Sequence, residues 1–274
     1  MSMSADQDYG DPVWARLKDE ALREVEQEPT LQDYLQETIL NVLTLEKALA
    51  EILAGKLTTC GMNRLQTRDL ILEAFEKSPH TASQIRNDLR AICDRDPAAR
   101  GYLLPFVFFK GFQALQTYRV AHYFWTHHRH FLALYFQNRS SEVFAVDIHP
   151  AAQIGSGILM DHATGVVIGE TCVIEDNVSL LHEVTLGGTG KQTGDRHPKV
   201  REGVLLGSGA KVLGNVEIGA RAKVGAGSVV LDPVPAHCTV AGVPARIVGR
   251  SRGQAPALDM DQDFPHHHED GSGI

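Results

Sequence analysis

The residues best suited to chemistry lie in the second half of the chain, where a histidine stands among carboxylates. His162 directly follows Asp161 and comes fifteen residues after Asp147. An imidazole ionises near neutral pH, and a carboxylate that holds one ring nitrogen leaves the other nitrogen to accept a proton. The grouping therefore predicts a general base at His162. The alternative is an ordinary surface histidine that bonds a backbone carbonyl.

Three further histidines, His149, His182 and His197, lie in or beside the same region. Imidazole is a common zinc ligand, so a metal site is a second hypothesis for this segment. His197 and Arg196 belong to a polar, glycine-rich stretch, residues 187–199, which we expect to loop out and cover a neighbouring surface.

The elements that position these residues are recognised by an apolar residue at every sixth position between residues 148 and 249. A period of six fits neither a helix nor a long strand, but it fits short straight segments joined by tight corners, three of which close a coil of about eighteen residues. We call this series of apolar residues the ladder. Its spacing gains two residues near His162, and it is interrupted at 187–199, so the candidate chemical residues lie where the repeat is irregular. Its rungs are Ile148, Ile154, Met160, Val166, Ile168, Ile174, Leu180, Leu186, Val200, Leu206, Val212, Ile218, Val224 and Val230.

The first 140 residues have helical patterns. Asp11 before Pro12 is typical of a helix start, Thr30 is expected to cap a second helix that ends near Gly55, and Thr81 with Gln84 has capping-box spacing. A β-helix leaves an open end, and so much apolar surface on short helices needs a partner. We expect the helices to cap the β-helix and to build an oligomer contact.

Composition narrows the class of protein. The chain has 274 residues, 43% hydrophobic content, a net charge of −8 and four cysteines, none in a Cys-x-x-Cys pair. These values predict a reduced, cytoplasmic protein that does not use nucleic acid as its main partner. Neither a signal peptide nor a membrane span is expected. The predicted fold class is α+β, with a helical N-terminal domain at 1–140, a β-helix at 141–250 and a flexible C-terminal tail at 251–274.

Longer motifs add a family resemblance. The chain resembles the bacterial serine O-acetyltransferases, members of the hexapeptide-repeat acyltransferase superfamily. The resemblance implies a left hand for the parallel β-helix, which the spacing alone does not give. It is carried by Val146-Asp-Ile-His-Pro-Ala-Ala152, Asp161-His-Ala-Thr-Gly165, Val184-Thr-Leu-Gly-Gly-Thr-Gly-Lys191, Gly194-Asp-Arg-His-Pro-Lys199, Gly225-Ala-Gly-Ser-Val-Val230 and Ala241-Gly-Val-Pro-Ala-Arg-Ile-Val248.

The resemblance implies transfer of acetyl from acetyl-CoA to the hydroxyl of L-serine, which gives O-acetyl-L-serine for cysteine biosynthesis. His162 would be the general base, and Asp147 would orient it and stabilise its imidazolium. Asp96 and Asp161 would receive the ammonium and hydroxyl region of serine, while Arg196 and His197 would hold its carboxylate. From the residues alone, Asp96 before Pro97 is equally well a plain helix cap. The alternative for Arg196 is a solvated loop charge, which the family match makes the weaker interpretation.

Acetyl-CoA is expected as a co-substrate, with no tightly bound cofactor and no metal. By resemblance it lies in a groove between adjacent β-helices of a trimer, against Gly188, Ser208 and Ala226, with Lys223 and Arg246 near its phosphates. Small residues are also what tight β-helix corners require, so these assignments remain open. The resemblance further implies feedback inhibition by L-cysteine and a hexamer of two trimers.

The last residues carry a partner hypothesis. Family members end in a flexible tail whose terminal isoleucine enters the active site of O-acetylserine sulfhydrylase, and this chain ends in Gly271-Ser-Gly-Ile274. Three other functions compete: a hexapeptide acyltransferase acting on a sugar or an amine, a zinc-dependent β-helix hydratase, and a scaffold that only recruits the sulfhydrylase. A thiol-release assay with acetyl-CoA and L-serine separates them.

Overall fold

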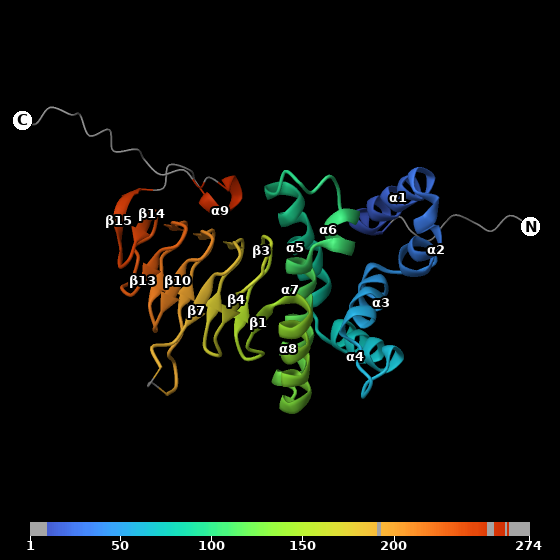
Figure 1. Ribbon diagram of the computed structural model, residues 1–274, viewed down its shortest axis with the longest axis horizontal. Coiled ribbons are helices and arrows are strands. Elements are labelled where there is room, and N and C mark those ends of the chain that lie inside the picture. The colour runs from blue at the N-terminus through green and yellow to red at the C-terminus, as the bar shows by residue number, and fades with distance from the viewer. Residues whose placement is uncertain (1–9, 191–192, 251–254, 261, 263–274) are drawn as a thin grey trace, which may run out of the picture.

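The computed structural model describes residues 10–190, 193–250, 255–260 and 262. A group of helices at the N-terminal end is followed by a stack of short strands wound into a parallel β-helix (Figure 1). Ile274 and most of the predicted tail lie outside the described residues. Among those described, no helix is both long and apolar enough to cross a membrane.

The helices precede the β-helix, apart from one short helix near the C-terminus. They are α1 (Pro12–Gln27), the 3-10 helix η1 (Pro29–Leu31), α2 (Gln32–Leu35), the π-helix η2 (Gln36–Leu40), α3 (Leu45–Leu57), α4 (Arg64–Lys77), α5 (Thr81–Arg95), α6 (Leu103–Phe108), α7 (Lys110–Thr126), α8 (His130–Phe144) and α9 (Pro256–Asp259).

Helix starts follow the sequence signals only in part. The Asp11 cap is confirmed, because its carboxylate accepts hydrogen bonds from the amides of Val13 and Trp14. The single helix expected from residue 31 to Gly55 is wrong: α2 and η2 end at Leu40, and Thr44 caps a new helix, α3. Helical spacing of apolar residues continues across such a break, so periodicity does not reveal it. The capping box at Thr81 is also wrong, since α5 has no side-chain cap.

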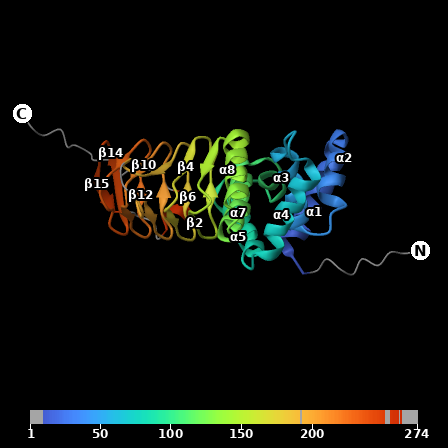
Figure 2. The ribbon, with the colours of Figure 1, turned by 90° about the horizontal axis from the view of Figure 1, so that it is seen from below.

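The strands form three flat faces. They are β1 (Val146–Ile148), β2 (Gln153–Ile154), β3 (Leu159–Met160), β4 (Val166–Ile168), β5 (Val173–Ile174), β6 (Ser179–Leu180), β7 (Thr185–Gly187), β8 (Lys199–Val200), β9 (Leu205–Leu206), β10 (Lys211–Leu213), β11 (Glu217–Ile218), β12 (Lys223–Val224), β13 (Val229–Val230), β14 (Cys238–Gly242) and β15 (Ala245–Arg250). Every third strand pairs in parallel, giving the sheets β1-β4-β7-β10-β13, β2-β5-β8-β11 and β3-β6-β9-β12-β14-β15, of which only the β14–β15 pair is antiparallel (Figure 2).

The predicted ladder is confirmed in register. Met160 pairs with Leu180, Leu180 with Leu206, and Leu206 with Val224, all buried. The two-residue slip is a longer first coil, because Ile148 pairs with Ile168, twenty residues later. The interrupted region, residues 187–199, leaves the stacking undisturbed.

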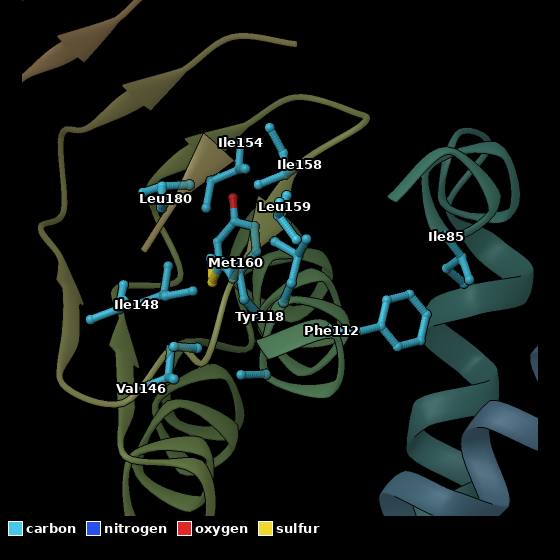
Figure 3. Packing of buried hydrophobic residues seen from close by; sticks show 14 of the residues in the cluster. Ile85, Phe112, Tyr118, Val146, Ile148, Ile154, Ile158, Leu159, Met160 and Leu180 are labelled. Carbon is cyan, nitrogen blue, oxygen red and sulfur yellow. The ribbon is translucent and has the colours of Figure 1, made fainter. Parts of the chain in front are cut away.

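The prediction that helices cap the β-helix is confirmed by α7, which lies against the first coil. Phe112 and Tyr118 belong to the same buried cluster as the rung residues Ile148 and Met160 (Figure 3). The approach is close enough to require glycine at Gly111, where an added Cβ would lie 2.1 Å from the carbonyl oxygen of Met160. The first coil and the start of α7 are thus held at a fixed distance.

A buried ion pair joins the same two parts. Asp88 of α5 is fully buried and accepts hydrogen bonds from the Arg119 guanidinium of α7 at 2.6 and 3.1 Å and from the amide of Ile158 at 3.0 Å. Arg119 also donates to the carbonyl of Gly155 at 2.9 Å. Both charges therefore have partners, as buried ions require.

Part of the segment predicted to be a flexible tail is helical. Pro256 and Ala257 of α9 are buried, and the carbonyl of Ala257 accepts a hydrogen bond from Ser179 of β6 at 2.8 Å. The same serine hydroxyl accepts a hydrogen bond from Arg95 of α5 at 3.1 Å. Four residues are too few to mark a helix in the sequence, and this one is stabilised by what it packs against.

Candidate active site

His162 lies in the corner that contains the two extra residues of the first coil. His162 and Ala163 have φ values of 55° and 56°, and Gly165 has a φ of 75°. This left-handed region is unfavourable for residues with a Cβ. The His162 side chain is 77% exposed. The corner thus projects an imidazole from a rigid backbone into open space.

Carboxylates and a second histidine surround this imidazole. Nε2 of His162 lies 3.8 Å from a carboxylate oxygen of Asp161, and the rings of His162 and His182 are 6.0 Å apart. The pKa of Asp161 is raised, chiefly by burial and further by the nearby Asp96 carboxylate, while His162 and His182 oppose the rise. Asp96 at the end of α5 is therefore near enough to Asp161 for their charges to interact. It also accepts a hydrogen bond from the amide of Ala98.

Asp147 lies in the middle of β1 and accepts a hydrogen bond from the side-chain amide of Gln137 on α8 at 2.7 Å. Within the described chain, no hydrogen bond joins Asp147 to His162. Catalytic hydrogen bonds are often loose until substrate binds, so the orienting role of Asp147 stays a prediction.

Arg196 and His197 form a second cluster. The Arg196 guanidinium binds the Glu170 carboxylate at 2.7 Å, and the Thr171 hydroxyl accepts hydrogen bonds from the backbone amides of both Arg196 and His197. Nδ1 of His197 accepts a hydrogen bond from the Thr171 amide at 3.1 Å, which leaves Nε2 as the protonated nitrogen of the neutral ring. Burial, and then the Arg196 charge, lower the pKa of His197.

The two clusters lie at opposite ends of β4. Asp161 and His162 precede this strand, whereas Glu170 and Thr171, which hold Arg196 and His197, follow it. Three strand residues span about 10 Å. Among the described residues, no hydrogen bond or ion pair joins the two clusters.

The residues predicted to contact CoA also divide into two groups. Ser208 and Ala226 lie in the same corner of successive coils as His162 and His182, and we call this stack of residues the corner column. Within it the amide of Gly209 donates to the carbonyl of His182, and the amide of Gly227 donates to the carbonyl of Ser208. Gly188 lies instead at the second cluster, where an added Cβ would be 3.5 Å from Nε2 of His197. Lys223 in β12 is only 5% exposed, while Arg246 is exposed beside Asp232. Arg246 is the more accessible of the two predicted phosphate partners.

The four histidines do not gather into a metal site. Among the residues the structure describes, no three His, Cys, Asp or Glu side chains are placed to hold a metal ion. His162 and His182 share one corner, whereas His197 belongs to the second cluster and His149 packs against Trp125.

Several residues that contact these clusters were not predicted from the sequence to be part of the site. Gln137 reaches Asp147 from α8, Glu170 and Thr171 hold the loop with Arg196 and His197, and Lys110 at the start of α7 donates to the hydroxyl of Thr164. Glu170 and Thr171 occupy ordinary outward positions of a regular hexad. Nothing in their spacing distinguishes them from solvated surface residues.

Known proteins of one family match this sequence along almost the whole chain. Residues 13–117 match the family model described as serine acetyltransferase, N-terminal, and residues 197–232 match bacterial transferase hexapeptide (six repeats). The serine acetyltransferase of Salmonella typhimurium is 51% identical over 265 residues, which cover 96% of this chain and 97% of that protein.

The chain belongs to the serine acetyltransferase family.

Solved structures of this family share the fold. The crystal structure of the Vibrio cholerae serine acetyltransferase has a TM-score of 0.91 and 54% identity, and the match covers 92% of this chain and 98% of that one. The Brucella abortus serine acetyltransferase in complex with coenzyme A has a TM-score of 0.87 and 48% identity, with coverage of 90% and 99%. The predicted family and the predicted left-handed β-helix are both confirmed.

Proposed function

We propose that this chain acetylates L-serine by direct attack of the serine hydroxyl on acetyl-CoA, with His162 as the general base. One observation carries the proposal: the exposed imidazole stands on a rigid left-handed corner between the Asp161 carboxylate and His182, at the foot of the column that contains Ser208 and Ala226. A base at this position can contact a small amino acid bound beside Asp161 and also the thioester of a CoA molecule that lies along the corner column. The fall in turnover of His162→Ala, described in the Discussion, tests the proposal.

The reaction then needs no acyl-enzyme. His162 takes the proton of the serine hydroxyl while the oxygen bonds to the thioester carbonyl carbon, which gives a tetrahedral intermediate. When the carbon–sulfur bond breaks, the imidazolium returns that proton to the departing thiolate. The products are O-acetyl-L-serine and CoA. Asp147 stabilises the transient imidazolium, and an alcohol gains about 10²–10⁴-fold in rate from such a base.

Serine is bound by charge. Asp161 and Asp96 receive its ammonium and hydroxyl region, and Arg196 and His197 bind its carboxylate through charge-assisted hydrogen bonds. Because these pairs lie at opposite ends of β4, we propose that Asp96, Asp161 and His162 of one chain face Arg196 and His197 of a neighbouring chain. A soybean serine acetyltransferase has been solved with serine, which supports serine as the acceptor.

Arg196→Ala tests the carboxylate contact. We expect KM for serine to rise about ten- to a hundredfold, the loss typical of a hydrogen bond to a charged group, while KM for acetyl-CoA changes little. Initial rates at varied serine and varied acetyl-CoA measure both values. Arg201→Ala, which removes another paired surface arginine of the β-helix, is the matched control and should change neither. Equal increases for both substrates would instead indicate general disorder of the loop.

Mixed oligomers test the division of the site between chains. His162→Ala and Arg196→Ala chains, co-expressed with different tags, should form some interfaces in which an intact His162 faces an intact Arg196. In a cyclic trimer with random mixing about one site in four is of this kind, so activity at low serine should recover to about a quarter of wild type. A mixture no more active than the average of the two separate variants would place the whole site within one chain.

CoA is proposed to lie along the corner column, its pantetheine against Ser208 and Ala226 and against Gly188 of the neighbouring chain, with Arg246 and Lys223 toward its phosphates. The Brucella abortus complex with coenzyme A supports this co-substrate. A serine acetyltransferase solved with cysteine supports L-cysteine as a feedback inhibitor that occupies the serine site.

The oligomer proposed is a hexamer of two trimers, with residues 1–140 as the helical oligomerisation domain, 141–250 as the acetyltransferase domain and 251–274 as the tail. The Phe131 side chain on α8 is 90% exposed, and Leu104 and Phe108 of α6 are also exposed, which leaves apolar surface available for contacts between chains. A cytoplasmic location fits the free thiols found at all four cysteines.

The tail is proposed to bind O-acetylserine sulfhydrylase through Ile274, and removal of this residue tests the contact. A variant that ends at Gly273 should keep its acetyltransferase rate, because Ile274 lies far beyond the last coil. Loss of the isoleucine contact and displacement of the terminal carboxylate should weaken sulfhydrylase binding by about two decades or more. Titration calorimetry of the two proteins measures the affinity. Unchanged affinity would remove the assembly proposal and leave the enzyme proposal intact.

A further inference from the structure

The corner that presents His162 has an unusual backbone. Other corners of the β-helix turn through single left-handed residues, such as Asn177, Glu183 or Arg221. The corner at 161–165 contains three, at His162, Ala163 and Gly165. Strained backbone persists only where neighbouring structure over-determines it. The His162 side chain is exposed, so the contacts that fix its position must act on the backbone around it.

Three of those contacts involve Thr164, beside other backbone hydrogen bonds such as that from the amide of Gly165 to the carbonyl of Ala145. The Thr164 amide donates to the carbonyl of His162 at 2.8 Å, and its carbonyl accepts from the amide of Glu183 on the next coil at 2.7 Å. Its hydroxyl accepts a hydrogen bond from the Lys110 ammonium. The first two contacts belong to the β-helix, and the third comes from the helical region.

Lys110 is itself held in place. It is the first residue of α7, and the next residue, Gly111, packs so closely on Met160 that no Cβ fits between them. Met160 ends the strand that leads into the corner. The start of α7 therefore contacts the corner on both sides of His162, at Met160 before it and at Thr164 after it.

We infer that Lys110 and Thr164 form a clamp that sets the position of His162 for proton transfer. Both are positioning residues: they act through the backbone of the corner. The inference rests on the proposed role of His162 as general base. A displacement of about 1 Å in a reacting group can cost about a hundredfold in rate, so the clamp affects turnover more than binding.

Two variants open the clamp without changing side-chain size much. Lys110→Met keeps the side-chain stem and removes the ammonium, and Thr164→Val keeps the shape and removes the hydroxyl. Each should lower kcat about ten- to a hundredfold, with KM for serine and for acetyl-CoA within about twofold of wild type and with an unchanged melting temperature. Lys110→Arg and Thr164→Ser, which retain the donor and the acceptor, should restore most of kcat. Lys47→Met, an exposed lysine in the first turn of α3, is the charge-matched control and should have no effect.

Combined variants separate the clamp from other roles. The double variant Lys110→Met/Thr164→Val should lose no more than either single variant, since both remove one contact. In a His162→Ala background, Lys110→Met should cause no further loss. Wild-type kcat in the single variants, additive losses, losses that follow the melting temperature, or a further loss without His162 would each overturn the inference. Normal turnover by His162→Ala alone would instead overturn the general base, and the kcat of Lys110→Met would then decide whether the contact matters to turnover at all.

Discussion

Replacement of His162 by alanine is expected to lower kcat by about two to four decades while coenzyme A binding is nearly unchanged. The imidazole acts on the proton of the attacking hydroxyl in the transition state, and it is not needed to recognise the nucleotide part of the co-substrate. Thiol release from acetyl-CoA in the presence of L-serine measures kcat, and titration calorimetry with CoA measures binding.

His237→Ala is the matched control for this experiment. His237 is also an exposed histidine in a left-handed corner, with a φ of 60°, but it lies near the C-terminal end of the β-helix. Its replacement removes the same atoms from the same backbone conformation, so it should leave kcat unchanged. Near-normal turnover by His162→Ala would end the assignment of the base. A parallel loss of CoA binding would show that the corner had lost its shape.

Asp88→Ala is expected to lower the free energy of unfolding by about 3–5 kcal/mol. Asp88 is fully buried and is the carboxylate partner of Arg119, which is 4% exposed. Removal of the acid leaves a guanidinium in the protein interior without its counter-ion, and it also removes the acceptor for the amide of Ile158 in the first coil. Urea denaturation at fixed protein concentration measures the change, because oligomer stability depends on concentration.

Two further variants test whether the loss of stability comes from the burial of the ion pair. Asp69→Ala breaks the exposed pair with Arg68 and should cost no more than about 1 kcal/mol. The double variant Asp88→Leu/Arg119→Met removes both buried charges and should recover part of the stability lost by Asp88→Ala. If Asp88→Ala is as mild as Asp69→Ala, the pair does not join the helices to the β-helix in the way its burial suggests.

The β-helix could be predicted from the amino-acid sequence, because one apolar side chain in each short straight segment must point inward and its period is visible without any contact between coils. The pair Leu206–Val224 follows from that period alone, and the pair Met160–Leu180 follows once the two-residue slip is counted. The irregular places in the ladder also mark the residues of the proposed active site. The two extra residues of the first coil form the corner that carries His162, and the interrupted segment carries Arg196 and His197.

The positions of these clusters relative to one another could not be predicted from the sequence and depend on how the chain folds. Nothing in the spacing of Asp96 reveals that its charge acts on Asp161, because their separation depends on how the helices pack on the first coil. The division of the proposed serine residues between the two ends of β4 is likewise set by the folding of the loop onto Glu170 and Thr171. The helix break before Thr44, the short helix α9 and the Lys110–Thr164 contact were missed for the same reason. The last two are stabilised by residues distant in the sequence, and a periodic pattern reports only which face of an element is buried, not what covers it or where the helix is interrupted.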